Sequence, residues 1–142
     1  MQLTEKLPDL ASEGYDAAIW LWSPRADRSH EWSARRLAPN RRVLVAAPAY
    51  LAARGTPASL DDLAGHEWLV VRENQQFDTW TLQSVDREGR PLPGSAPSTA
   101  RVKGALSSNS GELVRDWCLA GRGIMLRSLW DVAHHLRDGT LH

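Results

Sequence analysis

The sequence is poor in cysteine, with Cys118 as the only one among 142 residues. A single thiol excludes an internal disulfide and a zinc site built from several cysteines. An excess of one charge is also missing, because 17 lysine and arginine residues balance 17 aspartate and glutamate residues. This balance argues against a chain whose main task is to hold nucleic acid or an anionic membrane, since both reward clustered positive charge.

Long hydrophobic runs are absent as well. No apolar run approaches the roughly 20 residues that a membrane span needs. Residues 1–6 lack the basic stretch and apolar block of a signal peptide. We therefore expect a cytoplasmic protein without a membrane partner. At 42% hydrophobic and 24% charged residues, the composition is typical of one globular domain or two small lobes.

Buried strands alternate with short helices along the chain. Residues 15–22, 41–47, 68–71 and 123–127 form apolar runs, which predict strands covered on both faces. Strands that alternate with helices predict an α/β fold with parallel strand neighbours. The expected helices end at Gly55, Gly65, Gly121 and Gly139, and their starts are indicated by Pro48, by Ser59 with Asp62, by Asn109 with Glu112 and by Ser128 with Asp131.

The middle of the chain has a different pattern. Residues 79–83 and 101–106 alternate between apolar and polar side chains, as half-exposed strands do. Together with residues 68–71 they predict a three-stranded antiparallel element, in which residues 91–99 form a loop.

Catalytic and metal-binding motifs are missing from the sequence. Cys118 falls on the apolar stripe of its predicted helix, where a small core residue is expected rather than a nucleophile. His134 and His135 are about 100° apart on a helix, which is poor geometry for one metal, so we expect a solvated face. No phosphate-binding glycine loop and no hydrolase elbow occurs. We therefore expect no enzymatic activity, no cofactor and no metal.

One basic cluster, formed by Arg35, Arg36, Arg41 and Arg42, surrounds a Pro-Asn turn. Such a cluster can contact phosphate, but it is more often a solvated strand end. No helix-turn-helix with a basic recognition helix can be placed in this sequence.

Two loops at strand ends carry more hydrogen-bonding groups than the turns need. Residues 72–76 follow a buried strand, and residues 107–111 precede a predicted helix. Backbone N–H groups and the positive end of a helix suit a carboxylate or a similar anion. Ligands of open α/β sheets collect at the carboxyl ends of strands. The alternative is that Ser108, Asn109 and Glu112 only cap the helix.

Several segments match one known pattern in the same order along the chain. They include LAPNRRVLVAAPAYL at residues 37–51 and SSNSGE at 107–112, together with residues 13–19, 55–57, 62–70, 119–124 and 127–132. This series resembles the effector-binding domain of LysR-type transcriptional regulators and covers nearly the whole chain.

The resemblance implies the fold of a type 2 periplasmic-binding-protein lobe, a mixed sheet flanked by helices, with a small molecule held between two such lobes. It places residues 1–35 in a partial lobe one and residues 36–142 in a nearly complete lobe two. The winged helix-turn-helix of such regulators is absent from this chain, so we expect a piece of a longer protein. DNA contact is expected only through that missing domain.

The same resemblance implies where the ligand would bind. Trp20 and Trp22 stand where related domains often carry a basic residue and a glycine, and the two indoles can stack on an aromatic effector or fill space. The expected ligand is a small-molecule effector, such as a carboxylate or an aromatic acid. Its expected contacts, besides the two indoles, are Thr4, Arg72, Glu73, Asn74, Ser107, Ser108 and Asn109.

Partial lobe one also suggests self-association. In this chain Ala17, Ile19 and Leu21 lack the elements that would cover them. Exposed apolar strands recruit other chains, so we expect a homo-oligomer.

Two alternative functions stay open. One is a solute-binding protein of the same fold, whose parent would begin with a signal peptide. The other is a small hydrolase or transferase that depends on Ser108.

Overall fold

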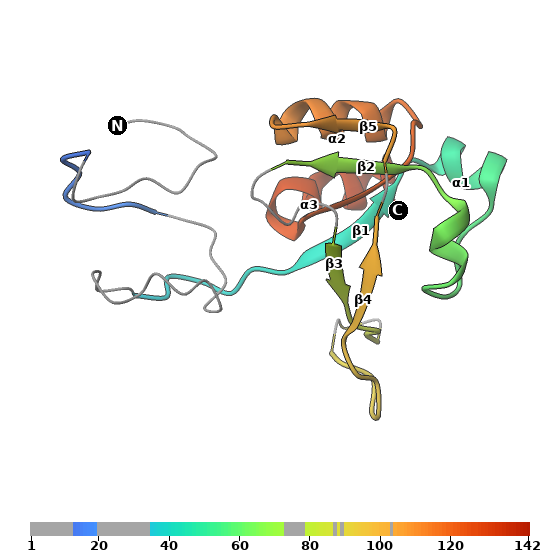
Figure 1. Cartoon of the computed structure of the whole chain (residues 1–142), viewed down its shortest axis with the longest axis horizontal. Coiled ribbons are helices and arrows are strands. Elements are labelled where there is room, and N and C mark those ends of the chain that lie inside the picture. The colour runs from blue at the N-terminus through green and yellow to red at the C-terminus, as the bar shows by residue number, and fades with distance from the viewer. Residues whose placement is uncertain (1–12, 20–34, 73–78, 87, 89, 103) are drawn as a thin grey trace.

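The main body of the protein is a four-stranded mixed sheet with strand order β1-β6-β2-β5 (Figure 1). Strands β1 (Arg42–Ala46) and β6 (Ile124–Ser128) are antiparallel, whereas β2 (Trp68–Val71) is parallel to both β6 and β5 (Leu106–Ser108). The predicted α/β class and mixed sheet are therefore confirmed. The computed structural model describes residues 13–19, 35–72, 79–86, 88, 90–102 and 104–142.

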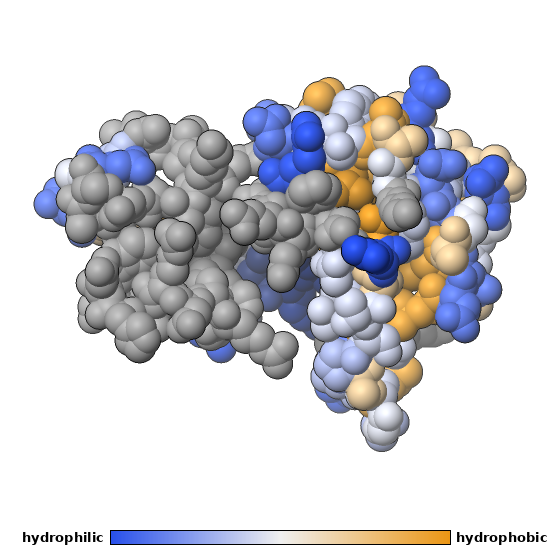
Figure 2. Space-filling view, viewed as in Figure 1, coloured by the Kyte–Doolittle hydropathy of each residue, from blue (hydrophilic) through white to orange (hydrophobic). Residues whose placement is uncertain are grey.

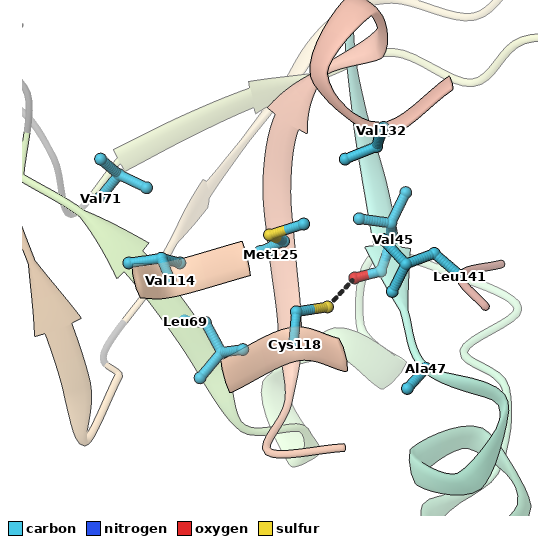
Figure 3. Close-up of a cluster of buried hydrophobic side chains, with 9 residues drawn as sticks. All are labelled: Val45, Ala47, Leu69, Val71, Val114, Cys118, Met125, Val132 and Leu141. Carbon is cyan, nitrogen blue, oxygen red and sulfur yellow. Dashed lines mark hydrogen bonds between the residues drawn. The ribbon is translucent and has the colours of Figure 1, made fainter. Parts of the chain in front are cut away.

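The two longer helices cover one face of this sheet. They are α2 (Gly111–Leu119) and α3 (Leu129–Asp138). From α2, Val114 and Cys118 pack with the strand residues around Met125, and Val132 of α3 completes the same cluster (Figure 3). The predicted apolar stripes of both helices are confirmed at these positions, with Trp117 and Leu136 packed against the cluster, but Leu113, expected on the stripe of α2, is 42% exposed.

The opposite face of the sheet is covered by smaller elements. These are α1 (Pro48–Arg54), the 3-10 helix η1 (Asp62–Gly65) and the hairpin of β3 (Thr79–Leu82) with β4 (Ser98–Arg101). Both faces of the sheet are therefore buried, which explains why β2 is apolar at every position. Tyr50, Leu63 and Trp80 are the buried residues that these elements contribute.

The β3–β4 hairpin projects from the sheet as a separate two-stranded ribbon (Figure 1). The ring of Trp80 meets that of Trp68 edge-on, with 4.9 Å between centroids, and this contact attaches the hairpin to β2. Pairing of β3 with β4 is antiparallel as expected, but the predicted three-stranded antiparallel element is wrong. Strand β2 pairs in parallel with β5 instead.

The strand expected over residues 101–106 is in fact interrupted. β4 extends back to Ser98, inside the expected loop, and ends at Arg101, and the chain resumes as β5 only at Leu106. Between them, Gly104 passes so close to β2 that a Cβ there would lie 2.1 Å from the Trp68 carbonyl oxygen. This close crossing moves the chain from the hairpin to the edge of the main sheet, which no local pattern indicates.

The expected strand at residues 15–22 is not formed in its described part. Residues 15–19 have no strand conformation, and Ile19 is 86% exposed. A strand needs a hydrogen-bonded neighbour, and no described segment pairs with these residues. Residues 20–22 lie outside the described ranges.

The last residues of the chain pair with β1. The amide of Ala46 donates to the His142 carbonyl at 2.8 Å, and the amide of His142 donates to the Ala46 carbonyl at 2.9 Å. Leu141 is fully buried in the α2–α3 core. Within the described ranges, each helix is too short or too polar to cross a bilayer.

Replacement of Leu69 by alanine tests this core. Leu69 of β2 is 1% exposed and packs with Val114 and Cys118 of α2. Leu69→Ala should therefore lower the free energy of unfolding by about 2–5 kcal/mol. Leu113 on α2 is 42% exposed and provides the matched control, for which about 1 kcal/mol or less is expected. Urea denaturation followed by tryptophan fluorescence measures both, and equal losses would contradict the assigned core.

Candidate functional site

Three strands end together at one edge of the sheet. Because β2 is parallel to β5 and β6, its carboxyl end lies beside theirs, with Val71 opposite Ser108. The amide of Arg72, the next residue after β2, donates to the Ser108 carbonyl at 2.8 Å. The structure thus brings Arg72 together with Ser107, Ser108 and Asn109. Ser107 and Ser108 are half-buried, while Arg72 and Asn109 are exposed.

The other residues expected at the site cannot be placed. Thr4, Trp20, Trp22, Glu73 and Asn74 lie outside the described residues. The described part of the candidate site is the edge of the sheet that Arg72 and residues 107–109 share.

Ser110, rather than Asn109, caps helix α2. The Ser110 hydroxyl accepts a hydrogen bond from the Leu113 amide at 3.3 Å, and the Ser110 amide donates to the Ser108 hydroxyl at 3.0 Å. The prediction that Asn109 is the cap is wrong by one residue, because β5 continues to Ser108 and the helix begins only at Gly111. Within the described part of the chain, the Asn109 side chain has no capping role and stays exposed.

A cluster of charged side chains lies beside the start of α2. Arg127, near the end of β6, donates from Nε to Oδ2 of Asp131 at 2.7 Å, and Arg115 of α2 donates to Oδ1 of the same carboxylate. All three side chains are largely buried, with exposed fractions from 16% to 23%. One carboxylate therefore joins β6, α2 and α3.

Asp131 is held in its ionised form within this cluster. Burial alone would raise the pKa of Asp131, but the hydrogen bond and charge of Arg127, together with Arg115, outweigh it and lower that pKa below 3.8. The contribution of the cluster to stability is accordingly present above pH 3.8 and is lost as the pH falls through the lowered pKa.

The capping box expected from Ser128 with Asp131 is not formed. The Ser128 hydroxyl donates instead to Oδ1 of Asn40 at 2.7 Å, and Asp131 is engaged by the two arginines. The sequence spacing fits a capping box, but long-range partners compete for both side chains. This cluster is the feature that sequence reasoning missed, and only its Arg-x-x-x-Asp spacing could have indicated an ion pair.

The basic residues Arg41 and Arg42 at the start of β1 lie at the end of the sheet where β6 also ends. Arg42 is paired with Ser128 across the β1–β6 ladder, and the Arg41 carbonyl accepts from the Leu129 amide at 2.8 Å. Both arginines are exposed, as expected for a solvated strand end. Their position at the end of the sheet where β6 also ends could not be read from the sequence, because it follows from a pairing between residues 86 apart.

An open groove lies on the opposite face of the sheet from α2. Its volume is about 1020 Å³, and Figure 2 shows hydrophobic side chains exposed between the β3–β4 hairpin and the α1–η1 segment, where the groove runs. The residues that line it come mainly from β1, β3, β6 and the segments around η1 and the hairpin loop, and they do not include Arg72 or residues 107–109. The groove and the candidate site are therefore separate features.

The remaining candidates from the sequence have structural positions. Cys118 is fully buried and points toward the Val45 carbonyl at 3.5 Å, and burial raises its pKa to about 12, which confirms the predicted core role (Figure 3). His134 is exposed, whereas His135 is half-buried and its Nδ1 lies 2.9 Å from the Thr140 hydroxyl.

Cys118 should resist alkylation in the native protein. A rise in pKa from 9.0 to about 12 lowers the thiolate fraction near neutral pH by about 1000-fold, and burial blocks access. We expect iodoacetamide labelling, followed by mass spectrometry, to be fast in urea and to require unfolding in its absence. Rapid labelling of the native chain would show that Cys118 is accessible.

The cap assignment makes a second testable difference. Ser110→Ala should lower the free energy of unfolding by about 1 kcal/mol, because it removes the acceptor for the Leu113 amide. Asn109→Ala is the neighbouring control and should leave stability nearly unchanged. Thermal denaturation of both variants decides the matter, and the reverse order of effects would make Asn109 the cap.

Comparison with known proteins agrees with this architecture. The family model described as the LysR substrate binding domain matches residues 1–142. The HTH-type transcriptional regulator DmlR of Escherichia coli is 40% identical over 138 residues, which cover 96% of this chain and 41% of DmlR. The HTH-type transcriptional activator TtdR of Escherichia coli is 37% identical over 141 residues, covering 99% of this chain and 42% of TtdR.

Solved structures show the same likeness. The regulatory domain of CrgA from Neisseria meningitidis superposes with a TM-score of 0.56 at 33% identity, covering 72% of this chain and 46% of that one. The regulatory domain of AphB from Vibrio vulnificus gives a TM-score of 0.58 at 26% identity, with the same coverage of 72% and 46%. The chain spans less than half the length of these curated relatives. Matched along its whole length, it belongs to the family of LysR substrate-binding domains, with their periplasmic-binding-protein-like fold.

Proposed function

We propose that this chain senses a small-molecule effector for a longer LysR-type transcriptional regulator. The observation that carries the proposal is the meeting of Arg72 with residues 107–109 at the carboxyl ends of β2 and β5. Ligands of open α/β sheets bind at such an edge. Asn109 adds a second argument, because Ser110 caps α2 and leaves the exposed Asn109 amide available to a ligand.

The proposed effector is a carboxylate. The site lies at the N-terminus of α2, where the backbone N–H groups and the helix dipole favour negative charge. Arg72 follows β2 directly, and Arg127 lies near the end of the neighbouring strand β6. An aromatic carboxylate would in addition use Trp20 or Trp22, with Thr4, Glu73 and Asn74 as further contacts.

The proposed arrangement has two lobes, with residues 1–35 in lobe one and residues 36–142 in lobe two. Among the residues that the structure describes, the sheet, its two hydrophobic clusters and the helices α1, α2 and α3 lie in the second range, as one expects of a lobe with its own core. The proposed parent is a cytoplasmic homo-oligomer that contacts DNA through a domain outside this chain. The effector shifts its conformational equilibrium by binding one state more tightly than the other.

Catalysis is not part of the proposal. The curated relatives are named transcriptional regulators. Within the described residues, no group of three or more metal-ligating side chains comes together, and the Cys118 thiol is buried. A solute-binding protein or a small hydrolase is therefore less well supported than a sensor.

A thermal-shift panel tests the proposed function. Aliphatic and aromatic carboxylates, each with its neutral amide as control, are added to the protein that contains this chain, because a ligand raises stability by RT ln(1 + [L]/Kd). We expect at least one carboxylate, and not its amide, to raise the melting temperature. Equal shifts with acids and amides would contradict an anion site.

Asn109 variants then locate the binding site. Asn109→Asp should weaken carboxylate binding by about 0.5–1.5 kcal/mol, or up to about 3 kcal/mol where charges meet, because the new carboxylate repels the ligand and donates no hydrogen bond. Stability should be unchanged, since Ser110 is the cap. Isothermal titration calorimetry gives the affinities. If Asn109→Asp binds the carboxylate as tightly as the wild type, the loop is not a ligand contact.

A further inference from the structure

The start of α2 is in contact with a side chain from another element. A Cβ placed on Gly111, the first residue of α2, would lie 2.2 Å from both terminal nitrogens of Arg127 and 2.4 Å from its Cζ. Only glycine leaves room for the guanidinium at this point. Arg127 therefore abuts the first residue of α2. The segment just before it, residues 107–110, consists of the last residues of β5 and the turn into α2; it is called the turn of residues 107–110 below and belongs to the proposed effector site.

The position of Arg127 is electrostatically unfavourable with respect to α2. The N-terminus of a helix carries partial positive charge, so a cation beside it is destabilising. Something other than α2 must therefore hold the guanidinium there. Asp131 contributes to this, because its Oδ2 accepts from Arg127 Nε at 2.7 Å.

Asp131 is itself fixed from two sides. Its second oxygen accepts a hydrogen bond from Arg115, which lies within α2. Asp131 also lies in the first turn of α3, where the helix dipole favours negative charge. Arg115 and Arg127 thus share one carboxylate. Because the three side chains are largely buried, solvent screens the attraction between their charges only weakly. The carboxylate links the body of α2, the start of α3 and, through Arg127, the start of α2.

We propose that Asp131 is a positioning residue of the effector site, which holds Arg127 against Gly111 and thereby fixes the turn of residues 107–110. The inference rests on the proposed function, in which this turn contacts the effector. Asp131 does not itself touch the ligand. Its role is to keep the Ser110 cap and the adjoining turn in one conformation before the effector arrives.

Amide hydrogen exchange on the protein without ligand tests the first half of this proposal. Asp131→Asn keeps the shape of the side chain and removes its charge. We expect exchange at Leu113 and Val114, whose amides donate to the hydroxyl and the carbonyl of Ser110, to accelerate about tenfold or more, and by a larger factor than exchange at Leu69 and Met125, which reports the loss of global stability.

Asp86→Asn is the matched control. Asp86 also accepts from an arginine four residues away, Arg90, at 2.7 Å from Nε, but this pair is on the exposed hairpin. Its loss should leave exchange in α2 unaltered. Unchanged exchange at the start of α2 in Asp131→Asn, or equal acceleration throughout the core, would overturn the proposal and leave the cluster a structural ion pair.

Affinity for the carboxylate found in the thermal-shift panel tests the second half. Asp131→Asn should weaken it about tenfold, with Asp86→Asn unchanged. A loosened turn with full affinity would overturn the positioning role. If no carboxylate binds the wild type, the proposed function has failed, and the exchange pattern alone then decides whether Asp131 orders the turn.

Discussion

The parallel pairing of β2 with both β5 and β6 is the constraint on which the rest of the structure depends. Parallel strands place their carboxyl ends at the same edge, and this is why Arg72 meets residues 107–109. Parallel strands also require connections that cross a face of the sheet. The helix α2 supplies such a connection between β5 and β6, so its N-terminus has to lie at the edge where the strands end.

The charged cluster reinforces the geometry that the sheet imposes. Backbone pairing brings the β5–α2 turn and the end of β6 to one edge, and Asp131 then joins side chains from both. At the same junction, Ser128 and Leu129 hydrogen-bond to Asn40 and to the Arg41 carbonyl. The segment that leads into β1 is thus attached where the proposed site lies, although β1 itself is at the far edge from β5.

Local features of the structure were predictable from the sequence, and pairings between distant segments were not. The apolar run of residues 68–71 indicated a strand buried on both faces, and Gly139, which has a φ of +77°, ends α3 as a left-handed residue should. The antiparallel element was wrong because alternation at residues 79–83 and 101–106 says nothing about which strand is the neighbour. The close passage of Gly104 over Trp68, which separates the hairpin from β5, is a long-range contact.

The structure brings Arg72 and residues 107–109 to one edge of the sheet, but some roles that the sequence assigned to this part of the chain are wrong. Asn109 and Ser110 are both good capping residues, and only the length of β5 decides between them. Likewise, Ser128 and Asp131 have capping-box spacing, but the nearby arginines determine where the carboxylate binds. The family resemblance implied that these strand ends share a ligand site, which local patterns alone do not indicate and which stays a prediction.

The parallel pairing of β2 with β5 and β6 can be measured directly by nuclear magnetic resonance on a uniformly labelled chain. Coupling across the hydrogen bond from the Arg72 amide to the Ser108 carbonyl, with cross-strand contacts between Leu69 and Leu106 and between Trp68 and Ile124, would show the parallel register. The account predicts all three signals. Contacts that instead pair β2 antiparallel with residues 101–106 would contradict it, because the strand ends that form the proposed site would then lie apart.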